Sequence, residues 1–223
     1  ELKNDKSPVT IADLQSSDYI CSELKNLCKD TPIICEETKQ IDYDERKNYK
    51  YFWLVDPLDG TKEFINKNGQ FTVNIALLKN NKPILGVVGI PTQKKIYYAE
   101  IGKGSYLKYN NEISKISCKK IDYSNKVKIV CSNSHFNHDT KDYLNKLSYS
   151  YDLLRFGSSL KFLKVAEGEA DIYPRLEGTK EWDTAASHII VDEAGGKILL
   201  SNDNNSTLKY NKESLKNPYF IVY

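Results

Sequence analysis

The stretch Trp53-Leu-Val-Asp-Pro-Leu-Asp-Gly-Thr-Lys-Glu-Phe64 decides the fold of this 223-residue chain. Residues 51–55 are apolar and aromatic, which predicts a strand, and the Asp-Pro-Leu-Asp-Gly turn signal is expected to end that strand at once. The turn would bring two carboxylates, Asp56 and Asp59, to one point, and the rigid proline between them would aim the Leu58 carbonyl at the same point. Such oxygen-only ligand sets suit hard divalent cations, and Mg²⁺ in particular.

Gly60, Thr61 and Lys62, which follow directly, offer what a phosphate group requires. Glycine allows a close approach to the backbone, threonine offers a hydroxyl, and a following helical turn would present free N–H groups. A lone Asp-Gly pair is usually an ordinary turn. The complete string is far more specific, and it predicts a site for a metal and a phosphate.

Three other segments carry acidic residues that can complete such a site. Glu36 and Glu37 end a short apolar strand over residues 33–35, Asp183 opens a helix expected over residues 183–194, and Asp13 lies early in a helix expected over residues 10–28. Each also has an ordinary interpretation. A Glu pair is often solvated surface, an Asp before Thr-Ala-Ala is often an N-cap, and an acidic side chain in a first helical turn is favoured by the helix dipole. The functional interpretation of Asp13 is as the partner of a hydroxyl or water that loses a proton.

The rest of the chain divides into two patterns. Residues 38–50 are polar and predict a mobile loop. Gly, Asn and Pro then separate strand-like runs, which indicates antiparallel pairing, whereas strands and helices alternate after about residue 124. We therefore expect an N-terminal α+β unit, 1–124, and a C-terminal α/β unit, 125–223. The expected strands are 71–78, 84–90, 95–99, 105–107, 127–131, 151–155, 171–173 and 220–223, and the later helices are 138–147, 158–168 and 183–194.

Four segments, residues 8–13, 36–37, 53–64 and 182–196, resemble the inositol-monophosphatase superfamily of Mg²⁺-dependent, lithium-sensitive phosphatases. They occur in the order of that family and at compatible spacing. The resemblance implies a layered αβαβα sandwich, α+β or α/β in class, with the active site between its two halves. It also implies that the first helix of the family would precede Glu1.

Within this superfamily, the chain more closely resembles the 3'(2'),5'-bisphosphate nucleotidases of sulfur metabolism. Lys62-Glu63-Phe64 after Asp-Gly-Thr and the segments 157–162 and 166–175 carry that resemblance. It implies hydrolysis of adenosine 3',5'-bisphosphate to AMP and phosphate, with the sulfated analogue as an open second substrate. Two alternatives stay open: an inositol or sugar monophosphatase of the same superfamily, and a silent module that senses a phosphorylated nucleotide.

The same resemblance assigns roles to individual residues. Asp13 and Thr61 match the pair that activates water, and Ser158, Lys161 and Arg175 match contacts to the second phosphate. Ser158 and Lys161 are three apart at an expected helix start, so they would share a face, and Arg175 is one of only three arginines. The implied ligands of two or three Mg²⁺ ions are Glu36, Asp56, the Leu58 carbonyl, Asp59 and Asp183, with Glu37 behind them. The implied substrate contacts are Glu36, Leu58, Asp59, Gly60, Thr61, His135, Ser158, Lys161, Arg175 and Asp183.

The composition limits the classes of partner that the protein can bind. The net charge is 32 − 30 = +2, which excludes a nucleic-acid binder that acts through bulk electrostatics. The longest apolar stretches, such as residues 84–90, are too short to cross a bilayer. Five cysteines without a Cys-x-x-Cys pair argue against a disulfide framework or a zinc site, and they favour a reducing cytoplasm. We expect a small-molecule nucleotide as the partner of a monomer or homodimer, and we leave peripheral attachment to the cytoplasmic side of the inner membrane open.

Overall fold

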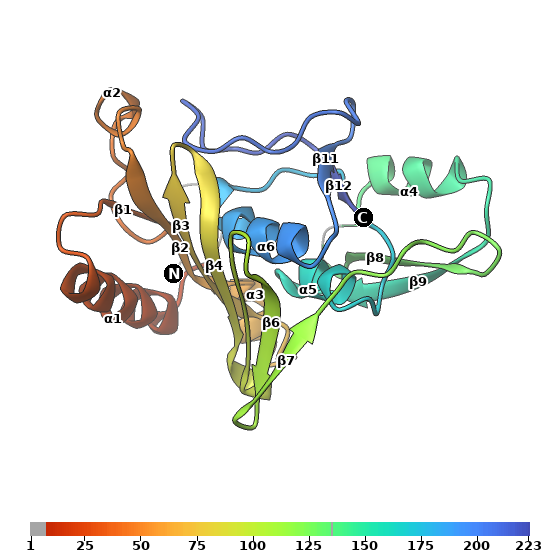
Figure 1. Ribbon diagram of the computed structural model, residues 1–223, viewed down its shortest axis with the longest axis horizontal. Coiled ribbons are helices and arrows are strands. Elements are labelled where there is room, and N and C mark those ends of the chain that lie inside the picture. The colour runs from red at the N-terminus through yellow and green to blue at the C-terminus, as the bar shows by residue number, and fades with distance from the viewer. Residues whose placement is uncertain (1–7, 135) are drawn as a thin grey trace.

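The chain folds into five stacked layers in the computed structural model, which describes residues 8–134 and 136–223 (Figure 1). The expected αβαβα sandwich is confirmed. A helix covers one face of a large sheet, two helices lie against the other face, smaller sheets follow, and a last helix lies outside them. In this order the helices are α1 (Ile11–Leu27), then α5 (Leu160–Ala166) with α6 (Glu181–Glu193), and finally α4 (His138–Asn145).

The large sheet has its seven strands in sequence order. The first pair is parallel, which was not predicted, and all later pairs are antiparallel. The antiparallel pairing of the strands after residue 71 was predicted. The last strand was not expected, because four of its five residues are exposed and it lacks an apolar signal. The strands are β1 (Ile33–Cys35), β2 (Tyr51–Asp59), β3 (Thr72–Lys79), β4 (Lys82–Ile90), β5 (Lys95–Glu100), β6 (Gly104–Tyr109) and β7 (Glu112–Ile116).

Alternation along β2 explains why helices cover both faces of this sheet. Successive side chains of a strand point to opposite faces. Trp53 and Val55 pack in a cluster with Leu24 of α1, whereas Phe52 and Leu54 belong to the main core, together with α6. β2 is therefore buried on both sides, and its end carries the aspartates into the interior of the molecule.

Gly86 of β4 allows α6 to lie directly on the sheet. A Cβ atom at this position would lie 2.4 Å from the carbonyl oxygen of Ala186 and 2.5 Å from Ile189 Cγ2. Real Cβ atoms do not approach other atoms so closely, so a larger residue here would push the helix away. Because Asp183 lies in the first turn of α6, this contact also determines how far Asp183 is from β2.

The smaller sheets form the fourth layer. β8 (Val127–Ser132) pairs with β9 (Tyr151–Phe156) in parallel, and β12 (Phe220–Val222) lies between β10 (Tyr173–Arg175) and β11 (Ile198–Leu200). The strand expected at residues 171–173 thus lies at 173–175, and the helix expected from residue 158 begins at Leu160. The main core joins residues from both sides of position 124, such as Leu78 and Ile190. The division of the chain at that position stays a prediction.

Residues 38–50 are not simply a loop, as was expected. They contain the short helix α2 (Tyr43–Arg46), which Arg46 anchors. This side chain is 3% exposed and donates hydrogen bonds to Asn211 Oδ1 at 2.8 Å and to the Glu213 carbonyl at 2.7 Å. Its partners lie about 165 positions away, so polar composition alone could not reveal this anchor.

The strand β2 also continues further than predicted. It runs through the proline to Asp59, with a register shift against β3 between Asp56 and Asp59. α3 (Thr61–Ile65) follows at once, and a single 3₁₀ turn (Pro91–Gln93) lies between β4 and β5. No helix of the described ranges, 8–134 and 136–223, is long and apolar enough to cross a membrane.

Candidate active site

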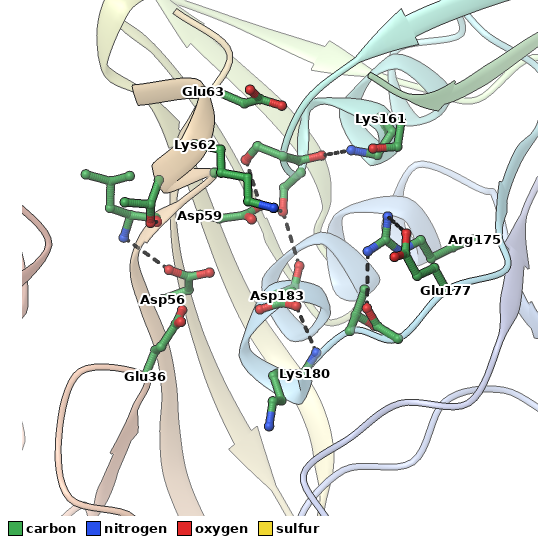
Figure 2. A pocket seen from close by; sticks show the side chains of 18 of the residues that line it. Glu36, Asp56, Asp59, Lys62, Glu63, Lys161, Arg175, Glu177, Lys180 and Asp183 are labelled. Carbon is green, nitrogen blue, oxygen red and sulfur yellow. Dashed lines mark hydrogen bonds and ion pairs between the residues drawn. The ribbon is translucent and has the colours of Figure 1, made fainter. Parts of the chain in front are cut away.

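A cavity of about 620 Å³ lies where the end of β2, α3, the starts of α5 and α6, and β10 converge (Figure 2). It brings together most residues that the sequence singled out, although they come from five different elements and from both sides of position 124. His135 lies outside the described residues. The predicted site residues that line the cavity are Glu36, Asp56, Leu58, Asp59, Gly60, Thr61, Ser158, Lys161, Arg175 and Asp183.

Three carboxylates meet at one end of this cavity. Glu36 directly follows β1, Asp56 lies on β2 and Asp183 lies on α6. One oxygen from each lies within 4.8 Å of the others, a spacing at which a single cation can contact all three (Figure 2). Asp59 and Leu58 belong to the same strand and line the same cavity.

Main-chain N–H groups hold two of the aspartates in place. The Leu58 N–H donates to Asp56 Oδ1 at 3.1 Å, and the Lys180 N–H donates to Asp183 Oδ2 at 2.8 Å. In each case the other carboxylate oxygen receives no hydrogen bond from the described residues. The local turn therefore fixes one oxygen and leaves the second available to a ligand.

The ionisation of these aspartates is unfavourable without a counter-charge. Burial first, and then Glu36, Asp59 and Asp183, raise the pKa of Asp56 well above its usual range. Burial, Asp59 and Glu36 likewise raise the pKa of Asp183 to about 8. A cluster of carboxylates that cannot all ionise at neutral pH has the electrostatic character of a cation site.

Thr61 and Asp13 form a hydrogen-bonded pair at the edge of this cluster. Thr61 Oγ1 donates to Asp13 Oδ1 at 2.9 Å. Asp13 is 1% exposed, and its second oxygen accepts the Thr10 N–H at 2.8 Å and the Thr10 hydroxyl at 2.5 Å. The cap of α1 thus orients Asp13. Because the Thr61 proton points to Asp13, the Thr61 oxygen is available to accept a hydrogen bond from within the cavity.

Gly60 makes the sharp turn into α3 possible. Its φ of 95° lies in the left-handed region, which favours glycine. A Cβ atom there would lie 3.3 Å from the Gln70 carbonyl oxygen and from Ser158 Cβ. The turn therefore needs glycine for its conformation as well as for space.

Two cations lie toward the other side of the cavity. Lys161 is 3% exposed, donates to the Ser158 carbonyl at 2.5 Å, and lies 5.5 Å from the centre of the Tyr173 ring. Arg175 Nη2 donates to the Gly178 carbonyl at 3.2 Å, and Nη1 lies 4.0 Å from Glu177 Oε2. Arg175 Nε is buried and has no partner among the described residues. This side of the cavity is therefore suited to an anion.

Comparisons with known proteins agree with this geometry. The inositol monophosphatase family model matches residues 1–219. The chain belongs to the inositol monophosphatase family. Within this family, it is 42% identical to 3'(2'),5'-bisphosphate nucleotidase CysQ of Salmonella typhimurium, over 99% of this chain and 87% of that protein. The crystal structure of CysQ from Bacteroides thetaiotaomicron matches with a TM-score of 0.88 at 38% identity, over 99% of this chain and 86% of that one.

An inositol monophosphatase from Anabaena shares the fold alone. Its TM-score is 0.80, but only 24% of the residues are identical, over 96% of this chain and 81% of that one. The fold is thus common to the family and does not separate one substrate from another. That distinction depends on the side chains around the cavity.

The acidic residues fit the divalent cation on which the family depends. Carboxylate oxygens and a backbone carbonyl are the donors that Mg²⁺ prefers. Glu36, Asp56 and Asp183 can contact a single ion, and Asp59 and the Leu58 carbonyl extend the set along β2. The chemistry of these donors and the distances between their oxygens are sufficient to show that the residues can hold such a cation.

The residues around Asp59 were only partly predicted. Asp59 Oδ2 accepts hydrogen bonds from Ser158 Oγ at 2.6 Å and from Ser159 Oγ at 2.9 Å. Ser158 is therefore a partner of a carboxylate, in a left-handed turn with a φ of 52°, and not the first residue of the helix. Ser159 was missed, although it stands in the same Gly-Ser-Ser segment, because only Ser158 matched the expected phosphate contact.

Lys161→Met is expected to change how the stability of the metal-free protein depends on pH. Burial and Arg175 lower the pKa of Lys161 to about 7, whereas the unfolded chain keeps the ordinary value of 10.5. The buried ammonium therefore costs folding free energy below pH 7, and this cost disappears as the pH rises toward 10.5. Each unit of pKa difference corresponds to about 1.4 kcal/mol.

The unfolding free energies of the wild type and of Lys161→Met, measured with urea between pH 6 and pH 10, test this expectation. The stability of the wild type relative to the variant should increase by a few kcal/mol across that range. The aspartates titrate in both proteins, so their contribution cancels in the difference. A difference that stays constant with pH would show that Lys161 is not held in a desolvated position.

Proposed function

We propose that the protein is a Mg²⁺-dependent 3'(2'),5'-bisphosphate nucleotidase that hydrolyses adenosine 3',5'-bisphosphate to AMP and phosphate. One observation carries the proposal: a single cavity combines an acidic cluster with a separate pair of cations, Lys161 and Arg175. A substrate with one phosphate needs only the acidic cluster. A substrate with two phosphates can use both, and the names of the relatives point to the same substrate class.

The two cations would bind the phosphate that is not hydrolysed. Arg175 offers a buried, unpartnered Nε to a phosphate oxygen. Lys161 would gain a charged partner, and a phosphate beside it would restore the ammonium form that burial disfavours. Both side chains are held by hydrogen bonds to main-chain carbonyls, so little conformational entropy is lost when the anion binds.

Asp13 and Thr61 would together remove the proton from the attacking water. Bound divalent cations supply Lewis-acid activation of water and neutralise the charge on the phosphoryl and leaving oxygens. Thr61 accepts a hydrogen bond from the water while its own proton points to Asp13, so the water's proton can pass through Thr61 to Asp13. The Thr10 cap holds Asp13 in position to receive it.

Several finer points belong to the same proposal. They are the binding of two or three Mg²⁺ ions per site, a monomer or homodimer as the working form, and a location in the cytoplasm. Hydrolysis of the sulfated analogue is a second proposed activity, and it would use the same two cations, Lys161 and Arg175. The roles of the individual site residues are part of the same proposal.

Thr61→Ala is expected to lower kcat about a hundredfold with little change in KM. If Thr61 orients the water, its contribution is made in the transition state and not in substrate binding. Steady-state kinetics at saturating Mg²⁺ measure this split. Thr61→Ser keeps the hydroxyl and is the matched control, which should retain most of the activity. A raised KM with normal kcat would mean that Thr61 only holds phosphate.

A phosphate-release assay on a substrate panel tests the proposed function as a whole. The panel comprises adenosine 3',5'-bisphosphate, its sulfated analogue, inositol 1-phosphate and fructose 1,6-bisphosphate, each with Mg²⁺ and with a chelator. We expect the adenosine bisphosphate to give the highest kcat/KM. A higher value for inositol 1-phosphate would favour the monophosphatase alternative. Binding of the nucleotide without any phosphate release would favour a sensor.

A further inference from the structure

The Ser159 hydroxyl lies between two residues of the acidic cluster, Asp59 and Asp183. Ser159 immediately precedes α5 and is 1% exposed. Its Oγ atom lies 2.9 Å from Asp59 Oδ2, at the end of β2, and 3.1 Å from the main-chain carbonyl oxygen of Asp183, in the first turn of α6. One hydroxyl thus contacts the two layers of the sandwich that supply aspartates to the cavity.

This hydroxyl is part of a ring of polar contacts that joins five side chains. Asn74 Nδ2 donates to Ser159 Oγ at 3.1 Å, and Thr72 Oγ1 lies 3.0 Å from Asn74 Oδ1. Thr72 Oγ1 is 2.7 Å from Ser158 Oγ, and Ser158 and Ser159 both donate to Asp59 Oδ2. Thr72 and Asn74 belong to β3, the strand beside β2. The ring therefore holds Asp59 from its own sheet and from α5 together.

The ring contacts only one oxygen of Asp59. Every hydrogen bond from the described residues to this carboxylate ends on Oδ2, and Oδ1 receives none from them. A carboxylate that donors hold by one oxygen cannot rotate freely about its χ2 angle, so its second oxygen keeps one direction. Because metal sites depend on such outer hydrogen bonds, losing one typically weakens metal affinity by about 10–100-fold.

We propose that Ser159 is a positioning residue for the divalent-cation site. Its hydroxyl shares one proton between Asp59 Oδ2 and the Asp183 carbonyl oxygen. It therefore orients Asp59 and sets the distance between the end of β2 and the start of α6, where Asp183 lies. The inference rests on the proposed function only through the metal site, and it does not depend on which phosphate ester is the substrate. Ser159 itself does not touch the reacting atoms.

Calorimetric titration with Mn²⁺ as the probe tests this inference on the metal-free protein. We expect Ser159→Ala to raise the Kd for Mn²⁺ about tenfold. Ser187→Ala is the matched control, because Ser187 is a fully buried serine of α6 whose hydroxyl has no partner among the described residues. Its Kd should equal that of the wild type. Steady-state rates should show a raised metal requirement for Ser159→Ala, with kcat recovered at saturating metal.

The outcomes distinguish a failure of the inference from a failure of the proposed function. Wild-type protein that binds no Mn²⁺ would overturn the proposed function along with the inference. Wild-type affinity in Ser159→Ala would overturn the inference alone, as would an equal loss of affinity in Ser187→Ala, because that loss would reflect a general loosening of the interior.

A second variant covers the case in which Ser159→Ala fails to fold. Thr72→Val keeps the shape of the side chain but removes the hydroxyl that joins Ser158 to Asn74 in the ring. We expect a smaller rise in the Kd for Mn²⁺, about two- to fivefold, because Ser159 and Ser158 still reach Asp59. An unchanged Kd in Thr72→Val would contradict the role of the ring.

Discussion

Asp56→Asn is expected to lower kcat more than a hundredfold, while the metal-free variant melts at a higher temperature than the wild type. Asp56 is one of the three carboxylates that meet in the cavity, and the loss of a charged metal ligand should remove about 3 kcal/mol or more of transition-state stabilisation. The amide oxygen of asparagine can still accept the Leu58 N–H bond, so the turn is preserved.

The gain in stability follows from the raised pKa of Asp56. Burial and three neighbouring carboxylates disfavour its ionised form in the folded protein. Above the pKa of the unfolded chain, near 3.9, ionisation therefore costs folding free energy, and the neutral asparagine removes this cost at pH 7. Loss of activity through misfolding would lower the melting temperature, so the two measurements together separate the causes.

Steady-state kinetics at saturating Mg²⁺ and thermal melts with a chelator are the measurements for this prediction. Asp192→Asn is a control: it also removes a carboxylate with a raised pKa, but one that is about half exposed and does not line the cavity. Its activity should stay near that of the wild type. Activity of Asp56→Asn within tenfold of the wild type would contradict the assignment of the acidic cluster.

Arg175→Ala should reduce the use of adenosine 3',5'-bisphosphate selectively. Truncating one partner of a desolvated charge pair costs about 2–5 kcal/mol, or roughly 30- to 5000-fold in kcat/KM. Arg175 offers a buried Nε that has no partner among the described residues, so it has an unused donor for the second phosphate. A nucleoside 3'-monophosphate lacks that phosphate, and its slower hydrolysis should hardly change.

The ratio of kcat/KM for the bisphosphate to that for the monophosphate measures this selectivity. Arg155→Ala is a suitable control, because Arg155 does not itself line the cavity. It lies over the Phe136 ring and reaches the cavity only through its hydrogen bond to the Ser132 carbonyl. The ratio should fall in Arg175→Ala only. If it falls in neither variant, the second phosphate is bound elsewhere in the cavity.

The sequence predicted the parts of the site that depend on local order. The strand at residues 51–55 and the following Asp-Pro-Leu-Asp-Gly-Thr turn are contiguous, so their geometry follows from proline, glycine and the apolar run. The cap of α1 is equally local, because Thr10 and Asp13 are three residues apart. The Gly, Asn and Pro residues between successive strands are also local signals, and they predicted the antiparallel pairing from β3 onward.

The parts that escaped prediction depend on contacts between distant residues. Ser159 is 100 positions from Asp59 and 85 from Asn74, and no local pattern distinguishes a serine that meets such partners from a serine in a loop. Glu63 is another example: it is 5% exposed and accepts a hydrogen bond from Ser134 at 2.5 Å. Its segment contributed to the family resemblance, but no role was predicted for Glu63 itself. The roles of Ser159 and Glu63 therefore depend on how distant segments of the chain pack together.

The most direct test of the proposed function is a ³¹P NMR time course of wild-type protein with adenosine 3',5'-bisphosphate and Mg²⁺. We predict that the signal of the 3'-phosphate disappears at the rate at which inorganic phosphate appears, while the 5'-phosphate signal persists as AMP. A chelator should stop both changes. Unchanged nucleotide signals with Mg²⁺, in a sample that hydrolyses inositol 1-phosphate, would contradict the account.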